Sequence, residues 1–299
     1  MIYVNKTNFI NPFKSLTKSS EFSFCRYFLS HLFLKYYSYL STMCYDVTSL
    51  TEAQLKYARH RSEDPEFIAE LERKLALLKG ESEAHYHVNA FSHPKLLVFT
   101  NAEPYTPKLF TWGLIPPWVK SREEALTIWN HTLNARAETL FEKPSFRHAA
   151  HQRRCLIMVD AFYEHHHLKN KTYPFRIRFK NHEPITFAGI WEEWTDPETG
   201  EFFETTTIVT TNGNDLLARI HNNPKADGPR MPVILPKNKQ DEWLKQDTEE
   251  NLKQLLIPFS DKELEAYTVR RLRGKEYIGD VEEITEEIMY PELEGNLLG

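Results

Sequence analysis

The sequence is short of cysteine and of long apolar runs. It has three cysteines in 299 residues, Cys25, Cys44 and Cys155, too few for the disulfide framework of a small secreted domain. No stretch approaches the roughly 18 consecutive apolar residues that a membrane-spanning helix requires. These two absences exclude a disulfide scaffold and a helical membrane protein, and they favour a reducing, cytoplasmic compartment without membrane association.

The familiar catalytic and cofactor-binding motifs are also missing. There is no GxGxxG, no phosphate-binding P-loop, no HExxH, no GxSxG and no paired CxxC, so no cofactor is expected. The net charge of −5 gives no global basic field, and any nucleic-acid site has to be a local patch on an acidic protein. Hydrophobic residues make up 41% of the chain, which is ample for a folded core.

Thirteen histidines raise the question of a metal site. They gather at His85, His87 and His93, and again at His165–His167. Consecutive histidines on a strand point to opposite faces and cannot all reach one ion. Because no Asp or Cys stands nearby at ligand spacing, we expect solvated histidines and no metal.

The first 42 residues differ from the rest of the chain. They contain five basic residues against one acid, eleven Phe and Tyr, and neither Ala nor Gly. A secretory signal fits poorly because its best apolar run, Phe28–Leu34, is interrupted, and a transit peptide fits poorly because Arg26 is the only arginine. We favour translation from Met43, with residues 1–42 a non-native, disordered extension read from AT-rich noncoding DNA. That start decides whether Cys44 has a free amine.

The remaining chain predicts an α+β domain. Helices are expected over Thr51–Arg61, Asp64–Lys79, Ser121–Ile128, Asn214–Arg219, Lys239–Lys245 and Glu249–Leu256. Strands are expected over Lys95–Thr100, Leu109–Leu114, Cys155–Ala161, Tyr173–Phe179, Ile185–Ile190, Phe202–Thr211 and Met231–Leu235. We expect a single domain built on a curved, mostly antiparallel sheet or open barrel flanked by helices. A C-terminal extension, 258–299, becomes acidic toward its end and is expected to be surface or partly disordered after Gly274.

Several short segments carry side chains suited to chemistry. They are Met43–Asp46, Trp112–Trp118, Leu133–Thr139, Val159–Glu164, and Ile220-His221 with Arg230–Leu235. Each also has a purely structural interpretation. A lone cysteine is usually inert core, Asn134 could be a helix N-cap, Glu164 could be solvated at a strand end, and His221 could cap a helix. The two tryptophans could simply pack.

Taken together, the segments resemble the SRAP family, the SOS-response-associated peptidases or abasic-site-processing proteins. The runs Trp-Gly-Leu-Ile-Pro-Pro-Trp, Asn-Ala-Arg-Ala-Glu-Thr and His followed by Arg-Met-Pro carry the resemblance, which extends from Met43 to about Ile257. It implies an SRAP-like catalytic domain at 43–257 that captures abasic sites in single-stranded DNA. Capture uses a cysteine that becomes the first residue when the initiator methionine is removed.

The resemblance also assigns residues. Cys44 matches the family's nucleophile, Asn134, Glu164 and His221 match its active-site Asn, Glu and His, and Arg136 and Trp118 match positions that line its DNA groove. It implies a DNA-damage function, with single-stranded DNA as the partner. We expect a monomer in the bacterial cytoplasm that associates with the nucleoid when bound to DNA.

The chain departs from the family pattern in three places. Tyr45-Asp46 stands where the family commonly has Gly-Arg, so a phosphate contact from that arginine is lost or supplied elsewhere. Tyr86–Ala90 replaces the usual Tyr-Asn-Val-Ala-Pro loop. Asn222–Pro229 lengthens the connection between His221 and Arg230, and we expect it to loop out without moving His221.

Two other functions remain open at this stage. The chain could be a cysteine peptidase acting on itself or on other proteins, with Cys44 as nucleophile and His221 as base. It could also be a non-catalytic single-strand-binding module that uses Trp118 and Arg136. An abasic-site lyase side activity is compatible with the first function, because a Schiff base permits β-elimination.

Overall fold

A computed structural model describes most of the chain. The described residues are 45–49, 64–78, 85–245 and 247–293. All of them belong to one compact unit, Thr42–Gly299. The pattern of contacts within the chain divides this unit from Met1–Ser41. Cys44, the predicted extension 1–42 and the predicted helix Thr51–Arg61 lie outside the described residues. No helix among the described residues is long and apolar enough to cross a membrane.

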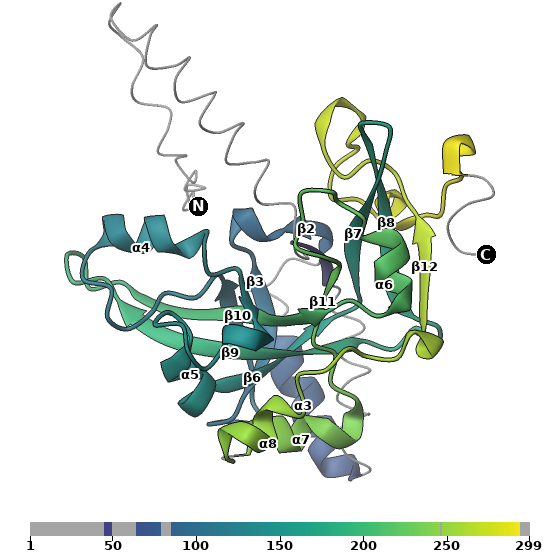
Figure 1. Ribbon diagram of the computed structural model, residues 1–299. Coiled ribbons are helices and arrows are strands. Elements are labelled where there is room, and N and C mark those ends of the chain that lie inside the picture. Colours follow the sequence, from purple (N-terminus) through teal and green to yellow (C-terminus); the bar gives the residue numbers. More distant parts are fainter. Residues whose placement is uncertain (1–44, 50–63, 79–84, 246, 294–299) are drawn as a thin grey trace, which may run out of the picture. The chain divides into compact units, whose positions relative to one another are not determined.

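Five strands close into a barrel (Figure 1). They are β3 (Lys95–Thr100), β4 (Pro107–Trp112), β6 (Arg154–Val159), β9 (Ile185–Thr195) and β10 (Phe202–Asn212). Around the ring the order is β10-β4-β3-β6-β9, and pairing of β9 with β10 closes it. All neighbours are antiparallel except β4 and β10. A tight turn at Asp196–Gly200, closed by a bond from the N–H of Gly200 to the carbonyl of Asp196, connects β9 to β10.

A second sheet of five antiparallel strands lies beside the barrel. Its order is β12 (Leu264–Thr268), β8 (Lys171–Phe179), β7 (Ala161–Leu168), β1 (Asp46–Ser49) and β2 (His85–Asn89). Two short strands add to β10, with β5 (Asn134–Arg136) parallel and β11 (Arg230–Pro232) antiparallel. The chain passes from β6 into β7 through Asp160, whose backbone N–H donates to the carbonyl of Thr48 on β1.

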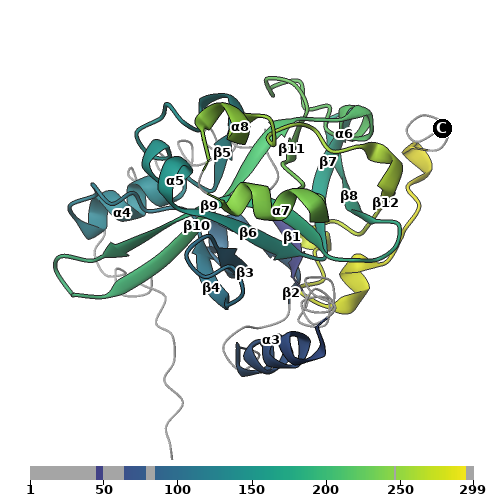
Figure 2. The ribbon, with the colours of Figure 1, turned by 90° about the horizontal axis from the view of Figure 1, so that it is seen from below.

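Helices cover the outer face of the barrel (Figure 2). These are α3 (Pro65–Leu78), α5 (Arg147–Gln152), α7 (Lys237–Leu244) and α8 (Glu249–Lys253). Two more helices follow barrel strands, α4 (Arg122–Trp129) after β4 and α6 (Asp215–Ile220) after β10. Their starts are set by side-chain caps: Ser121 accepts a hydrogen bond from the amide of Glu124, and Asn214 accepts one from the amide of Leu217.

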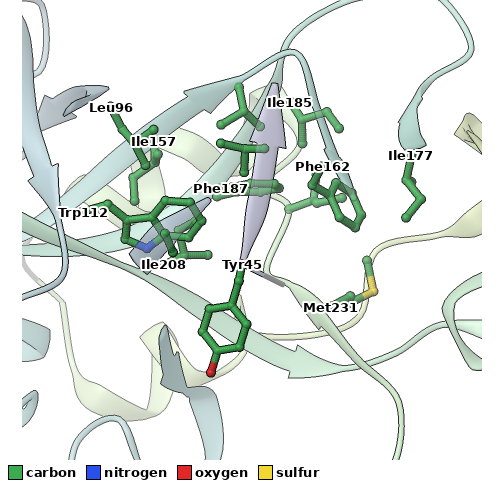
Figure 3. Close-up of a cluster of buried hydrophobic side chains, with 14 of the residues drawn as sticks. Tyr45, Leu96, Trp112, Ile157, Phe162, Ile177, Ile185, Phe187, Ile208 and Met231 are labelled. Carbon is green, nitrogen blue, oxygen red and sulfur yellow. The ribbon is translucent and has the colours of Figure 1, made fainter. Parts of the chain in front are cut away.

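Strand alternation divides the core into two layers. On β3, Leu96 and Val98 belong to the cluster inside the barrel, whereas Leu97 and Phe99 pack outward beneath the helices. Figure 3 shows the inner cluster, in which Ile157, Phe187 and other side chains from several strands point toward one another. Each such fully buried side chain contributes about 1.5–3 kcal/mol through the hydrophobic effect, so the barrel is the stable frame of the domain.

The fold class is confirmed, with a closed barrel in place of an open one. The strand predicted at Lys95–Thr100 has those bounds as β3. The strand predicted at Cys155–Ala161 corresponds to parts of two strands, because β6 ends at Val159 and β7 begins at Ala161. The strands β1, β2, β5 and β12 and the helix α5 were not predicted. The acidic stretch after Gly274 is mostly exposed as expected, but it is folded through Leu293 and buries Ile284 completely.

Candidate active site

A carboxyl and an imidazole meet in the second sheet. Glu164 lies in β7, and His221 is the C-cap residue of α6, where its N–H donates to the carbonyl of Leu217. Nδ1 of His221 lies 3.3 Å from Oε2 of Glu164, and the two side chains are 2% and 5% exposed. The solvated interpretation of Glu164 is therefore wrong, whereas His221 does cap a helix and also reaches the carboxyl.

Hydrogen bonds from the histidine run of β7 hold the end of α6 in place. Nδ1 of His166 lies 3.1 Å from the carbonyl of Arg219 and 3.2 Å from that of Ile220. Asn222, the residue after His221, accepts a bond from the N–H of His167 at 2.6 Å and donates to its carbonyl at 2.9 Å. These bonds fix both sides of His221 to the strand that carries Glu164.

The environment of Glu164 favours its neutral form. Burial raises the pKa of Glu164 well above 4.5, and the nearby negative charge of Asp46 raises it further. The N–H of His165 and the charge of Arg273 oppose the shift without cancelling it. A buried carboxylic acid with a raised pKa can donate a proton near neutral pH, which is the property of a general acid.

Asp46 is the charged neighbour of this pair. It begins β1, pairs with Tyr163 on β7, and is 2% exposed. Its carboxylate lies 3.0 Å from Nε2 of His87 and accepts bonds from Asn89 at 2.7 Å and Arg273 at 2.8 Å. Burial acts to raise the pKa of Asp46, but the contacts with His87 and Arg273 outweigh it and hold the pKa well below its usual value. Asp46 is therefore a buried carboxylate.

Asn134 and Arg136 lie on β5, next to β10. Asn134 pairs with Ile208 and is buried, so it begins a strand and is not the helix N-cap that was one interpretation of the sequence. Arg136 is two residues further along, and alternation places the two side chains on the same face of the strand. The guanidinium of Arg136 is one-third exposed and lies 3.5 Å from Asp227 of the lengthened connection after His221.

Arg230 fixes the other end of that connection. Its guanidinium makes a bidentate ion pair with Glu138, at 2.5 and 2.9 Å, and also donates to the carbonyl of Thr210 and to Asn212. Arg230 is buried, and Glu138 follows β5 in sequence. The pair therefore joins the strand that carries Asn134 to β11, and it confines the additional residues 222–229 between two fixed points.

Trp118 occupies a separate segment, the connection between β4 and α4. Its side chain is 43% exposed, and its indole N–H donates to the carbonyl of Pro144 at 3.3 Å. An exposed, anchored aromatic ring presents a flat surface to solvent, which suits stacking on a nucleic-acid base.

The expectation of solvated histidines is wrong for one member of each cluster, His87 and His166. His87 and His166 are buried, because each makes hydrogen bonds that tie neighbouring elements together. Within the described ranges, no group of three or more His, Cys, Asp or Glu side chains is arranged to hold a metal ion. Cys155, the free cysteine among the described residues, is fully buried, and burial raises the pKa of its thiol to about 12. It is therefore inert core.

Comparison with known proteins identifies the family to which the chain belongs. Residues 53–275 match the family model described as SOS response associated peptidase (SRAP). The chain belongs to the SRAP family. Of the assigned site residues, Trp118, Asn134, Arg136, Glu164 and His221 fall inside the matched region, and Cys44 precedes it.

Relatives named as abasic site processing proteins are similar over different shares of their length. The abasic site processing protein YoqW of Bacillus subtilis is 38% identical over 214 residues, which cover 71% of this chain and 90% of that protein. The abasic site processing protein HMCES of Pongo abelii is 31% identical over 151 residues, 42% of this chain and 40% of that protein. A crystal structure of a protein from Bacteroides thetaiotaomicron superposes with a TM-score of 0.70 and 31% identity, covering 82% of this chain and all of that one.

Sequence reasoning missed two residues near the Glu164–His221 contact. Asp46 was noted only as a departure from the family pattern, and Arg273 was not singled out. The unusual Tyr45-Asp46 pair was the available signal, because a carboxylate that enters a buried strand requires a cationic partner. The sequence did not show that this partner stands 227 residues away.

Proposed function

We propose that this chain processes abasic sites in single-stranded DNA by covalent capture through Cys44. The observation that carries the proposal is the buried Glu164–His221 contact beside the strand that follows Cys44. The family match and the printed names of the relatives support the same function.

The register of β1 supports the role of Cys44. Asp46 pairs with Tyr163, the residue before Glu164. The strand that follows Cys44 in the sequence therefore runs beside the strand that carries Glu164. The proposal further requires that the residues before Cys44 are removed, because only then does Cys44 carry a free amine.

The chemistry requires both nucleophiles of an N-terminal cysteine. The open-chain abasic sugar has an aldehyde. The α-amine of Cys44 attacks its carbon and water leaves, giving a Schiff base. The thiol sulfur then bonds to the same carbon, and the nitrogen takes up a proton, which closes a five-membered thiazolidine ring. The second attack is intramolecular and thus has a very high effective concentration. An internal cysteine has no amine to offer.

Glu164 and His221 supply the proton transfers. The neutral carboxyl of Glu164 donates a proton to the departing water and takes one back from the nitrogen, which leaves the neutral Schiff base. The thiol proton then moves to the nitrogen as the ring closes. His221 opens the cyclic sugar and exchanges protons at the ring oxygen, because an imidazole can both donate and accept a proton through its ring nitrogens. Asn134 orients the opened sugar with neutral hydrogen bonds.

Arg136 and Trp118 bind the flanking DNA. Arg136 offers a bidentate donor to a phosphate group, and its contact with the exposed carboxylate of Asp227 is one that a phosphate can replace. Trp118 stacks on a base next to the abasic site. Single-stranded DNA is the partner because such a surface needs unpaired bases.

The peptidase activity in the family name has a specific role in this proposal. The same Glu164–His221 pair assists hydrolysis of the Met43–Cys44 bond, with the Cys44 thiol as nucleophile, and this cleavage exposes the amine. Methionine removal after translation from Met43 gives the same terminus. The Glu164→Gln variant distinguishes the two routes. If the unmodified chain loses the residues before Cys44 and the variant retains them, the chain cleaves itself.

The test uses chain expressed from Met43 and an oligonucleotide whose uracil has been excised. The proposal predicts an adduct that survives heating on a denaturing gel, with the Cys44 peptide carrying the added mass of the sugar. Cys44→Ser keeps an N-terminal amine and should give only a labile Schiff base. Cys44→Ala also keeps the amine and is the matched control whose side chain has no nucleophilic atom. Absence of a heat-stable adduct with the unmodified protein overturns the proposal.

A further inference from the structure

A C-terminal segment is bound to the strand that follows Cys44. We call Arg273–Asp280 the strap. Arg273 donates to Asp46 on β1 at 2.8 Å, and the Asp280 carboxylate accepts a bond from the N–H of His87 on β2 at 2.9 Å. The strap therefore contacts the two strands at one edge of the second sheet. In Figure 2 the C-terminal part of the chain, in yellow, runs beside β2.

The strap holds β2 at more than one point. Oδ2 of Asp280 lies 2.8 Å from Nδ1 of His85, and the hydroxyl of Tyr277 lies 3.0 Å from Nδ1 of His87. Because Nε2 of His87 is also in contact with Asp46, a continuous chain of polar contacts runs from Tyr277 through His87 to β1. Tyr277 and Asp280 lie beyond the residues that match the SRAP family model.

Arg273 brings a permanent charge to a buried carboxylate. A buried carboxylate is strongly destabilised unless a cation and hydrogen bonds compensate it. Asn89 supplies a neutral donor, whereas Arg273 supplies a positively charged guanidinium and is itself 46% exposed. Removal of Arg273 therefore leaves Asp46 with a charge that its remaining neighbours compensate only in part.

We propose that Arg273 is a positioning residue that acts through Asp46: it anchors β1, and with it Cys44, beside Glu164, and it balances the charge next to the reacting groups. The inference rests on the proposed function. It assigns the strap a part in the reaction through β1 and β2, the strands that the strap contacts.

The charge balance has a direct effect on Glu164. The titratable and charged groups around this carboxyl are His221 from α6, Asp46 from β1 and Arg273 from the strap, and the backbone N–H of His165 on β7 also faces it. Asp46 raises the pKa of Glu164 and Arg273 lowers it. Loss of Arg273 should therefore shift the pH dependence of capture toward higher pH, an effect that a purely mechanical anchor would not produce.

The first experiment compares Arg273→Ala, Arg273→Lys and Arg270→Ala in protein that begins at Cys44. Arg270 is an exposed arginine three residues earlier that makes none of the contacts above. At saturating single-stranded abasic DNA, Arg273→Ala should slow adduct formation ~10-fold and raise the pH of half-maximal rate, with the half-saturating DNA concentration within ~2-fold of wild type. Arg273→Lys should restore part of the rate, and Arg270→Ala should behave like wild type.

An unchanged rate at saturating DNA, combined with a higher half-saturating concentration, would overturn the proposal, because that result describes a phosphate contact. A pH profile identical to wild type would also overturn it.

The second experiment does not depend on any DNA reaction. Hydrogen exchange of the full, unbound chain should be ~10-fold faster at the β1 amides Asp46–Ser49 in Arg273→Ala, with the β3 amides unchanged. Equal exchange at β1 contradicts the anchoring role. If wild-type protein forms no adduct while β1 exchange does increase, the proposed function fails and the anchoring by the strap stands.

Discussion

Oε2 of Glu164 lies 3.3 Å from Nδ1 of His221, and both side chains are almost completely buried. Strand β7 supplies the acid and the end of helix α6 supplies the imidazole, and bonds from His166 and Asn222 hold the two elements together. Such a contact places a proton donor and a proton acceptor side by side in a site of low polarity, where proton transfer needs little rearrangement.

Replacement of Glu164 by Gln should affect chemistry and spare binding. The amide keeps the shape of the carboxyl but cannot exchange a proton, so adduct formation at saturating DNA should slow by a factor on the order of 10². Single-turnover rates and DNA affinity should be measured on the same preparation. A wild-type rate in Glu164→Gln would exclude Glu164 as the acid.

The raised pKa of Glu164 also predicts a pH dependence of stability. Above the usual value of 4.5, the unfolded chain loses this proton while the folded chain retains it, so the free energy of unfolding falls as pH rises toward the folded pKa. Glu164→Gln removes this term. Its Tm relative to wild type should increase steadily above pH 4.5. The exposed Glu66→Gln is the charge-matched control, and parallel Tm curves for wild type and Glu164→Gln would contradict the prediction.

The pair between Glu138 and Arg230 should stabilise the frame of the site. Glu138→Gln leaves a buried guanidinium without its carboxylate, and because Glu138 is itself 46% exposed we expect a loss of about 1–2 kcal/mol. Denaturant unfolding measures it. The exposed Glu142→Gln should cost less than about 0.5 kcal/mol. Equal free energies of unfolding for the two variants would show that the Glu138–Arg230 pair does not stabilise the fold.

Arg136 should contribute to DNA affinity through a phosphate. Arg136→Ala should weaken binding of single-stranded DNA and reduce the slope of log affinity against log salt concentration by ~1. Fluorescence anisotropy at several salt concentrations provides the measurement. Arg73→Ala, on helix α3 over the outer face of the barrel, is the control. An unchanged salt slope in Arg136→Ala would place the phosphate contact elsewhere.

Trp118 should contribute by stacking. Trp118→Ala should lose about 1–3 kcal/mol of binding free energy for single-stranded DNA, whereas Trp118→Phe retains a ring and should lose less. The same anisotropy assay serves here. Equal losses in the two variants would mean that the ring does not stack on a base.

The sequence predicted the barrel better than the rest of the fold. In β3 every residue from Leu96 to Thr100 is buried, so a continuous apolar run marked the strand and its ends. The three- and four-residue strands β5 and β1 were not visible, because their stability comes from pairing with β10 and β7 and not from a local pattern. Tertiary context overrides propensity in such short elements.

The candidate site depended on the family resemblance more than on patterns. Glu164 and His221 lie 57 positions apart in the sequence, and no spacing rule joins a strand residue to the end of a later helix. The ion pair between Asp46 and Arg273 is still more distant. The histidine run His165–His167 was interpreted as solvated because its partners, the carbonyls at the end of α6, cannot be identified before the fold is known.

The mass of the mature protein is the most direct test of the account. Intact-mass measurement and N-terminal sequencing of the natively expressed protein should show a chain that begins at Cys44. A chain that retains the residues before Cys44, with its nitrogen in a peptide bond, would contradict the proposed covalent capture.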